Sequence, residues 1–237
     1  MITDKRKIQL QKFLNSVNLD CDLEYLDIAL THSSYCHENN LSYEICNERL
    51  EFLGDAVLKL VISDYLFNRF PDYHEGDLSQ IRSTVVSDKT LEKLAKTIKL
   101  QDYIVLGQAE ETNGGRKRSS TIACAFEAML GAFYLDGKLN EIKSFLENIY
   151  EDEITFVDKE GLKANTKALL QEYFQTISNN LPEYVLQKQE GPPHNRTFFV
   201  DVYFENEFLA SGKGSTKKDA QKNAAEKACQ KLGLLND

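Results

Sequence analysis

Carboxylates recur in two of the most apolar segments of the chain. The segment "NERLEFLGDAVL" carries Glu48, Glu51 and Asp55 among apolar side chains. At about 100° per helical residue, these three fall within one narrow stripe of an expected helix. A second expected helix, "SSTIACAFEAMLGAFYL", has Glu127 as its only charged residue. A carboxylate in such a setting is costly unless a cation neutralises it.

Two interpretations of the acidic stripe follow from the residues alone. It could be a solvated helix face, and Lys59, four residues after Asp55, is then a ready salt-bridge partner. Glu127 favours a second interpretation, in which two acidic helices face each other in a bundle and bind a divalent cation. Oxygen ligands suit Mg²⁺ or Mn²⁺, and such sites hydrolyse phosphodiesters.

The elements that must position these acids are helices. Amphipathic or apolar helical patterns follow one another through residues 1–155, and none of this region alternates clearly enough to indicate a strand. We expect an all-α domain there. A charged, weakly patterned segment at 156–163 is expected to be a linker. Residues 164–235 show helix, three strands and helix, which predicts a small α+β domain with both helices on one face of the sheet.

Composition sets outer bounds on the protein. Of 237 residues, 42% are hydrophobic and 27% are charged, and no apolar run is long enough to cross a bilayer. The first residues do not read as a signal peptide. Five scattered cysteines predict neither a disulfide framework nor a structural zinc site, so we expect a cytoplasmic protein with no membrane partner. The net charge of −9 is uneven, because residues 163–237 hold 10 basic and 9 acidic side chains.

Several motifs together resemble one family. "NERLEFLGDAVL", with "LTHSS", "HEGDLSQIRSTVV" and "FEAMLGAFYLD", is similar to the ribonuclease III family, and the resemblance extends into a double-stranded-RNA-binding domain. It covers essentially the whole chain, in the order of a bacterial-type enzyme. It implies a homodimeric, Mg²⁺-dependent endonuclease that cuts double-stranded RNA, leaves 5′ phosphates, 3′ hydroxyls and short 3′ overhangs, and needs no organic cofactor. Ribosomal precursor RNA, with some messenger or small RNAs, is the implied substrate.

The resemblance also implies roles for particular residues. Asp55 and Glu127 correspond to the catalytic metal–water site, and Glu51 to a further metal ligand. Glu48 and Glu75 are expected near the scissile strand or a second ion. Asn47 is expected to support these groups or contact a second subunit rather than take part in the chemistry. Phe52 is expected in the core or at a dimer interface, and His32 has no metal-ligand spacing with His37 or His74.

One position departs from the family pattern. Where the family has an aspartate three residues before Glu127, this sequence has Cys124. A thiol is a poor ligand for Mg²⁺, and nearby carboxylates should raise its pKa above the usual value of about 8.5. A water could fill the coordination position, Mn²⁺ could be preferred, or cleavage could be lost. The last case leaves a non-cleaving double-stranded-RNA-binding protein as the alternative to an enzyme. Because every other acidic position matches, we expect cleavage.

The second domain should contact RNA through phosphates and 2′-hydroxyls, since duplex RNA hides its base edges. Taken alone, each candidate element could be an ordinary solvated helix face or a plain turn. Together, in α-β-β-β-α order, they match the family. The predicted contacts come from the first helix, the first strand–strand loop and the start of the last helix: Thr166, Gln171, Glu172, His194, Lys217, Lys218 and Lys222.

Overall fold

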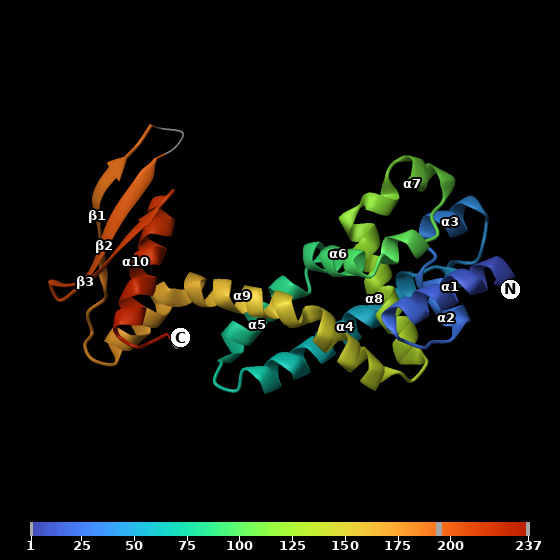
Figure 1. Cartoon of the computed structure of the whole chain (residues 1–237), viewed down its shortest axis with the longest axis horizontal. Coiled ribbons are helices and arrows are strands. Elements are labelled where there is room, and N and C mark those ends of the chain that lie inside the picture. Colours follow the sequence, from blue (N-terminus) through green and yellow to red (C-terminus); the bar gives the residue numbers. More distant parts are fainter. Residues whose placement is uncertain (1, 193–195, 236–237) are drawn as a thin grey trace. The chain divides into compact units, whose positions relative to one another are not determined.

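A computed structural model describes residues 2–192 and 196–235, except for the side chains of 159–165. The chain divides into two compact units, Met1–Val157 and Asp158–Asp237. The helices of the first unit appear in Figure 1 in sequence order: α1 (Asp4–Val17), α2 (Leu23–Ala29), α3 (Ser33–Glu38), η1 (Tyr43–Ile45), α4 (Glu48–Arg69), α5 (Glu75–Val85), α6 (Asp88–Thr97), η2 (Leu100–Tyr103), α7 (Gln108–Thr112), η3 (Gly115–Lys117), α8 (Ser119–Leu135) and the start of α9 (Leu139–Gln175).

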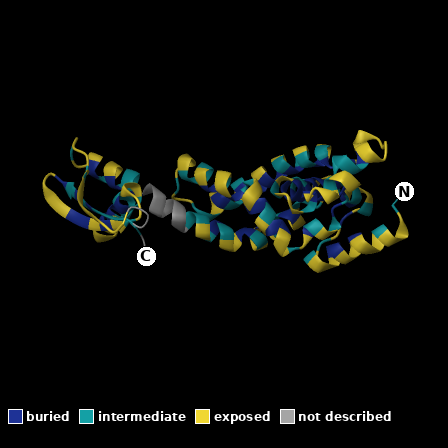
Figure 2. Cartoon of the chain, turned by 90° about the horizontal axis from the view of Figure 1, so that it is seen from above, coloured by how far each residue is buried: buried dark blue, intermediate teal, exposed yellow. Residues whose placement is uncertain are grey.

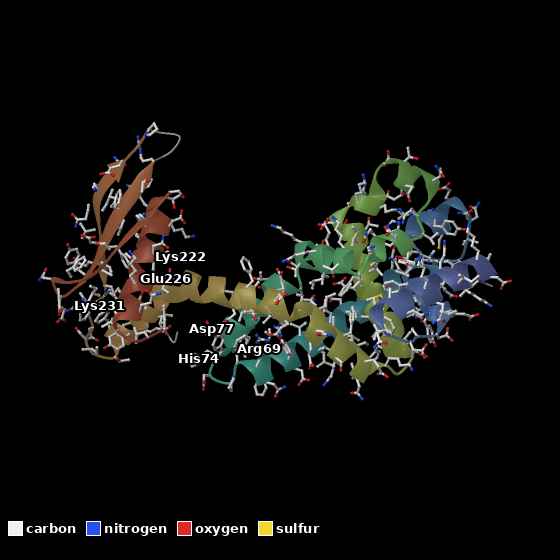
Figure 3. All side chains as sticks on the ribbon, viewed as in Figure 1. Arg69, His74, Asp77, Lys222, Glu226 and Lys231 are labelled. Carbon is white, nitrogen blue, oxygen red and sulfur yellow. The ribbon has the colours of Figure 1, made fainter. Side chains whose placement is uncertain are left out.

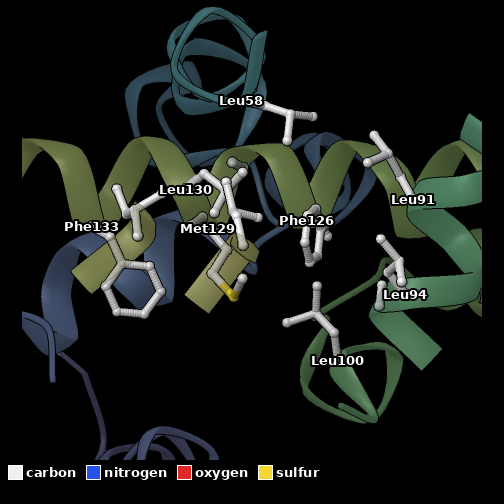
Figure 4. Close-up of a cluster of buried hydrophobic side chains, with 14 of the residues drawn as sticks. Leu58, Leu91, Leu94, Leu100, Phe126, Met129, Leu130 and Phe133 are labelled. Atoms are coloured by element: carbon white, nitrogen blue, oxygen red, sulfur yellow. The ribbon is translucent and has the colours of Figure 1, made fainter. Parts of the chain in front are cut away.

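Helix α8 is the centre of the first unit. It is apolar on almost every side, as expected of a helix surrounded by others, and Ala123, Phe126, Met129 and Leu130 are among its fully buried residues. Figure 4 shows the side chains of α8 packed against Leu58 of α4 and against side chains of α6 and η2. Figure 2 shows the same concentration of buried residues inside the helical unit. Any polar group on α8 is therefore held in a largely apolar setting.

Helices α4 and α8 approach each other closely at two glycines. A Cβ atom placed on Gly54 of α4 would lie 1.7 Å from the backbone oxygen of Glu127 on α8. A Cβ atom on Gly131 of α8 would lie 2.3 Å from the backbone oxygen of Leu50 on α4. Only glycine permits such backbone contact. The two acid-bearing helices therefore cross without intervening side chains at these points.

The boundary between the units falls inside α9. The segment at 156–163, which the sequence analysis expected as a linker, is helical and belongs to the single helix Leu139–Gln175. The expectation of two separate helices on either side of a linker was therefore wrong in its secondary structure. Helical periodicity continues across the charged segment, and no proline interrupts it.

The second unit is a three-stranded antiparallel sheet with helices packed on it. Strands β1 (Glu183–Glu190), β2 (Thr197–Phe204) and β3 (Glu207–Gly214) pair in sequence order. Helix α10 (Lys217–Lys231) packs on β2 and β3. The end of α9 contributes Leu170 and Phe174 to the same core, and the ring of Phe174 stacks on Phe204 with centroids 3.7 Å apart.

The predicted fold class, an all-α domain followed by a small α-β-β-β-α domain, is confirmed. Within the described part of the chain, no helix is both long and apolar enough to span a membrane.

Candidate active site

A pocket of about 580 Å³ opens where α4 meets α8. Its lining includes four of the five acids predicted from the sequence, Glu48, Glu51, Asp55 and Glu127. Cys124 also lines this pocket. The acids predicted from the sequence are therefore residues that the fold brings together from two separate helices. We call this cavity the acidic pocket.

The acids of α4 reach the pocket because the opposite side of the helix is buried. Leu50, Val57, Leu58 and Val61 all face the core. Glu48 and Glu51 lie in the first turn of α4, where negative charge complements the helix dipole. The dipole therefore offsets part of the cost of gathering carboxylates at this end of α4.

Glu127 is the most perturbed acid of the pocket. Burial on the apolar helix α8, followed by the negative charges of Asp55 and Glu51, raises its pKa from 4.5 to about 7. Mutual repulsion of this kind is relieved by a cation or a proton. Perturbed carboxylates in a pocket are typical of functional sites.

Cys124 lies in the acidic pocket, one helical turn before Glu127. Burial, followed by the adjacent Glu51 carboxylate and then the charge of Glu127, raises the pKa of its thiol to about 12. The predicted upward direction is confirmed. The thiol stays neutral at ordinary pH, so the pocket has one negative charge fewer than the family pattern would give it.

The donor chemistry of the pocket fits a divalent cation, although the side chains do not converge on one point. Within 2–192 and 196–235, no three His, Cys, Asp or Glu side chains are grouped closely enough to hold a metal ion. One reason is that Lys59 Nζ donates to Asp55 Oδ2 at 2.8 Å. This is the ion pair expected from the i,i+4 spacing. Both partners are substantially exposed, so breaking the pair costs only about 0–1 kcal/mol.

Glu75 is not in the acidic pocket. It is exposed in the first turn of α5, and its Oε1 accepts a hydrogen bond from Ser79 Oγ at 2.7 Å. The motif "HEGD" therefore supplies an acid at the surface of this unit, outside the lining described for Glu48, Glu51, Asp55 and Glu127.

Three further lining residues were not predicted to be at the site. His32, Ser33 and Asn47 complete the acidic pocket with Phe52. The sequence analysis gave His32 no role because it has no metal-ligand spacing, and gave Asn47 only a supporting one. Their position depends on the contact between residues 31–32 and Val105, which is distant in sequence and gives no periodic signal.

In the second unit, Lys217, Lys218 and Lys222 lie in the first two turns of α10 (Figure 3 labels Lys222). Lys217 and Lys218 are exposed, and Lys222 is partly exposed. Thr216 caps this helix by accepting a hydrogen bond from the Asp219 N–H at 3.1 Å. Cationic side chains and free backbone donors at one helix start suit a phosphate.

The other predicted RNA contacts differ in their accessibility. Gln171 and Glu172 are exposed on α9. Thr166 is fully buried, and its hydroxyl donates to the backbone oxygen of Lys222 at 3.4 Å, so it is not available at the surface. It joins α9 to α10 instead. His194 lies outside the described residues.

Two family models match the chain. Residues 22–153 match a model described as Ribonuclease-III-like, and residues 166–232 match the double-stranded RNA binding motif. The fold and the acidic pocket thus belong to a nuclease domain joined to a double-stranded-RNA-binding domain.

The chain belongs to the ribonuclease III family. It is 40% identical over 236 residues to "Ribonuclease 3" of Borreliella burgdorferi, covering 99% of this chain and 96% of that protein. It is 43% identical over 211 residues to "Ribonuclease 3" of Enterococcus faecalis, with 89% and 91% covered. The nuclease domain of ribonuclease III from Campylobacter jejuni superposes with a TM-score of 0.56 at 38% identity, covering 60% of this chain and 96% of that one.

The protein is therefore a ribonuclease III endoribonuclease, an enzyme that cleaves double-stranded RNA. The non-cleaving alternative raised by Cys124 is not favoured.

Proposed function

We propose that the protein hydrolyses double-stranded RNA in the acidic pocket with Mg²⁺, or with Mn²⁺ as a substitute. The observation that carries this proposal is the raised pKa of Glu127, which follows from burial and from the charges of Asp55 and Glu51. Three carboxylates from two helices share one cavity that has room for an ion and a phosphate group. Oxygen ligands of this kind suit hard divalent cations.

The residues take distinct roles in this proposal. Glu51, Asp55 and Glu127 hold the ion, with Asp55 exchanging its exposed partner Lys59 for the metal. A divalent cation, when bound, activates the attacking water and stabilises charge on the leaving oxygen. Glu48 lines the same pocket beside these ligands and faces the RNA strand. Glu75, which lies outside the pocket, acts on RNA from the surface of α5 or holds a second ion.

Cys124 modifies this site without emptying it of ligands. Its neutral thiol leaves three carboxylates for the ion and offers a soft atom where Mg²⁺ prefers oxygen. The coordination position is then left to water. Mn²⁺ is less demanding in this respect than Mg²⁺, which is why it is included as a substitute.

The proposed products carry 5′ phosphates, 3′ hydroxyls and short 3′ overhangs, and the proposed substrates include ribosomal precursor RNA and messenger RNAs. End-group analysis of a cut, internally labelled duplex tests this. A 5′ end that a phosphatase must expose before a kinase can label it supports the proposal. A 5′ hydroxyl or a 2′,3′-cyclic phosphate would contradict hydrolysis by an activated water.

A homodimer would set two acidic pockets against the two strands of one duplex. Phe52 supports such a dimer, because 82% of its surface is exposed beside a largely apolar pocket of about 720 Å³. Tyr25, Ile28 and Leu135 line that pocket, and exposed apolar areas of this kind mark interfaces. The solved Campylobacter jejuni nuclease domain is described as flexible in a region involved in dimer formation. Light scattering should give a dimer for the native protein and a monomer for Phe52→Glu.

The proposed RNA-binding surface of the second unit comprises Gln171, Glu172, Lys217, Lys218 and Lys222, together with His194 beyond the described residues. Thr166 is omitted because it is buried. We place the protein in the cytoplasm, on the basis of its cysteine usage and its RNA substrate.

A further inference from the structure

One side of the acidic pocket carries hydrogen-bond donors in place of acids. His32, Ser33 and Asn47 line the same cavity as Glu51, Asp55 and Glu127. We call these three residues the donor wall. None of them is charged in its usual state at neutral pH, and each has a side-chain N–H or O–H.

Asn47 is the key residue of the donor wall. Only 2% of its surface is exposed, and its Nδ2 is buried with no hydrogen-bond acceptor among the residues that the structure describes. Asn47 precedes α4 as its N-cap, yet its side chain caps no backbone N–H. An amide donor that is buried and unpaired is unfavourable. It is also rare enough to require an explanation.

The donor wall is held in place by backbone hydrogen bonds. The N–H of Asn47 donates to the oxygen of Thr31 at 2.9 Å, and the N–H of His32 donates to the oxygen of Val105 at 3.0 Å. His32 Nδ1 accepts a hydrogen bond from the N–H of Ser34 at 3.2 Å. In the neutral ring the proton then resides on Nε2, which leaves a second donor at this wall. The donors are thus fixed before any ligand arrives.

The chemistry of the pocket identifies what would accept these hydrogen bonds. The acceptor must be small, because Asn47 is almost fully enclosed. It must also be compatible with three carboxylates that repel anions. Neutral donors can hold an anionic oxygen without neutralising the carboxylates, which a lysine or arginine at this position would do.

We propose that the donor wall binds a non-bridging phosphate oxygen of the RNA strand in the acidic pocket, with the Nδ2 of Asn47 as the principal donor. This rests on the proposed function, because it is the substrate of the same pocket that is bound. Asn47 thereby fixes the phosphate relative to Glu51, Asp55 and Glu127.

The test combines a protein change with a substrate change. Cleavage of an RNA hairpin with one mapped cleavage site is measured for native protein, Asn47→Ala and Asn47→Ser. The scissile phosphate carries sulfur at either non-bridging position, each diastereomer being used separately. Asn47→Ser retains a hydroxyl donor and a favourable N-cap, and serves if Asn47→Ala does not fold. Asn140→Ala, at an exposed position of α9 outside the pocket, is the matched control.

The donor wall predicts that Asn47→Ala slows cleavage of the all-oxygen hairpin by about 10- to 100-fold, the range for losing a hydrogen bond to a charged acceptor. Asn47→Ser should recover part of this loss. One sulfur diastereomer should slow the native enzyme but cause no additional slowing in Asn47→Ala, because the two changes remove the same hydrogen bond. Multiplying effects for both diastereomers would overturn the proposal. So would unchanged cleavage by Asn47→Ala.

Failure of the proposed function would look different. If the native protein does not cut the hairpin with Mg²⁺ or Mn²⁺, the reaction is absent, and the donor wall is judged by binding. Asn47→Asp, which replaces the donor with a negative charge at the same size, should then weaken hairpin binding at least about tenfold. Equal affinities of the native protein and Asn47→Asp would overturn the donor wall.

Discussion

Gly54 on α4 lies against the backbone of Glu127 on α8, so closely that a Cβ atom on Gly54 would be 1.7 Å from the Glu127 carbonyl oxygen. This contact brings the acid-bearing faces of the two helices to one pocket. A residue with any side chain would push α8 away from α4. Glu127 would then move away from Glu51 and Asp55. The glycine therefore controls the geometry of the acids.

Gly54→Ala should destabilise the protein and reduce cleavage together. The new methyl group meets backbone rather than a flexible side chain, so we expect a loss in unfolding free energy of about 3 kcal/mol or more. Gly76→Ala is the matched control, because a Cβ on Gly76 of α5 meets nothing within 4 Å. It should be neutral or stabilising by up to about 1 kcal/mol. Chemical denaturation checks both, and equal stabilities of the two variants would refute the close contact.

Glu127 should make the metal-free protein less stable as the pH rises. Its pKa is raised from 4.5 to about 7 on folding, so the folded state holds this proton more tightly than the unfolded state does. The stabilisation is complete below pH 4.5 and is lost as the pH passes through about 7. We expect roughly 1–3 kcal/mol over this window, since each pKa unit is about 1.4 kcal/mol and partial exposure weakens the effect.

Thermal unfolding in the presence of a chelator measures this pH dependence. Between pH 5 and about 8, the native protein should lose stability relative to Glu127→Gln, whose amide does not titrate. Parallel curves for the two proteins would mean that Glu127 has an ordinary pKa and is not crowded by Asp55 and Glu51.

Cys124→Asp should increase cleavage with Mg²⁺. The substitution adds an oxygen ligand and a negative charge beside Glu51 and Glu127, so we expect a gain of about tenfold or more and a smaller advantage of Mn²⁺ over Mg²⁺. Cys124→Ser is the control, because it removes the thiol without adding a carboxylate. If Cys124→Ser speeds the Mg²⁺ reaction as much as Cys124→Asp does, the added charge is not the cause.

The lysines at the start of α10 should account for part of the salt dependence of RNA binding. Replacing Lys218 and Lys222 with Gln should weaken duplex binding and reduce the slope of log K against log salt by about one for each phosphate that the variant no longer neutralises. Lys227→Gln is the control, because Lys227 is exposed on the same helix but beyond its first turns. An unchanged slope in the double variant would exclude these lysines from phosphate binding.

The sequence was informative about faces and weak about distances. Helical periodicity grouped Glu48, Glu51 and Asp55 correctly, and the apolar setting of Glu127 indicated that it needed a partner. Periodicity cannot show which helix faces which, so the close approach at Gly54 was missed. A signal existed, because a glycine inside an apolar helix costs about 1 kcal/mol relative to alanine and usually has a packing reason.

Other features could not be read from local patterns. The donor residues His32 and Asn47 reach the pocket through backbone bonds involving Thr31 and Val105, which are far apart in sequence. Thr166 resembles a surface residue of the second unit but is buried between α9 and α10. Short polar side chains carry little information about burial, because either environment can satisfy one hydroxyl.

The most direct test of catalysis in the acidic pocket is cleavage of a long labelled duplex RNA with Mg²⁺ and, separately, with Mn²⁺, by the native protein and by Glu127→Ala. We expect cutting by the native protein, and loss of cutting in Glu127→Ala while RNA binding through the second unit is retained. Cutting by Glu127→Ala at the native rate would contradict the assignment of the acidic pocket. Binding without cutting by the native protein in both metals would contradict catalysis itself, and restoration by Cys124→Asp would then identify the thiol as the cause.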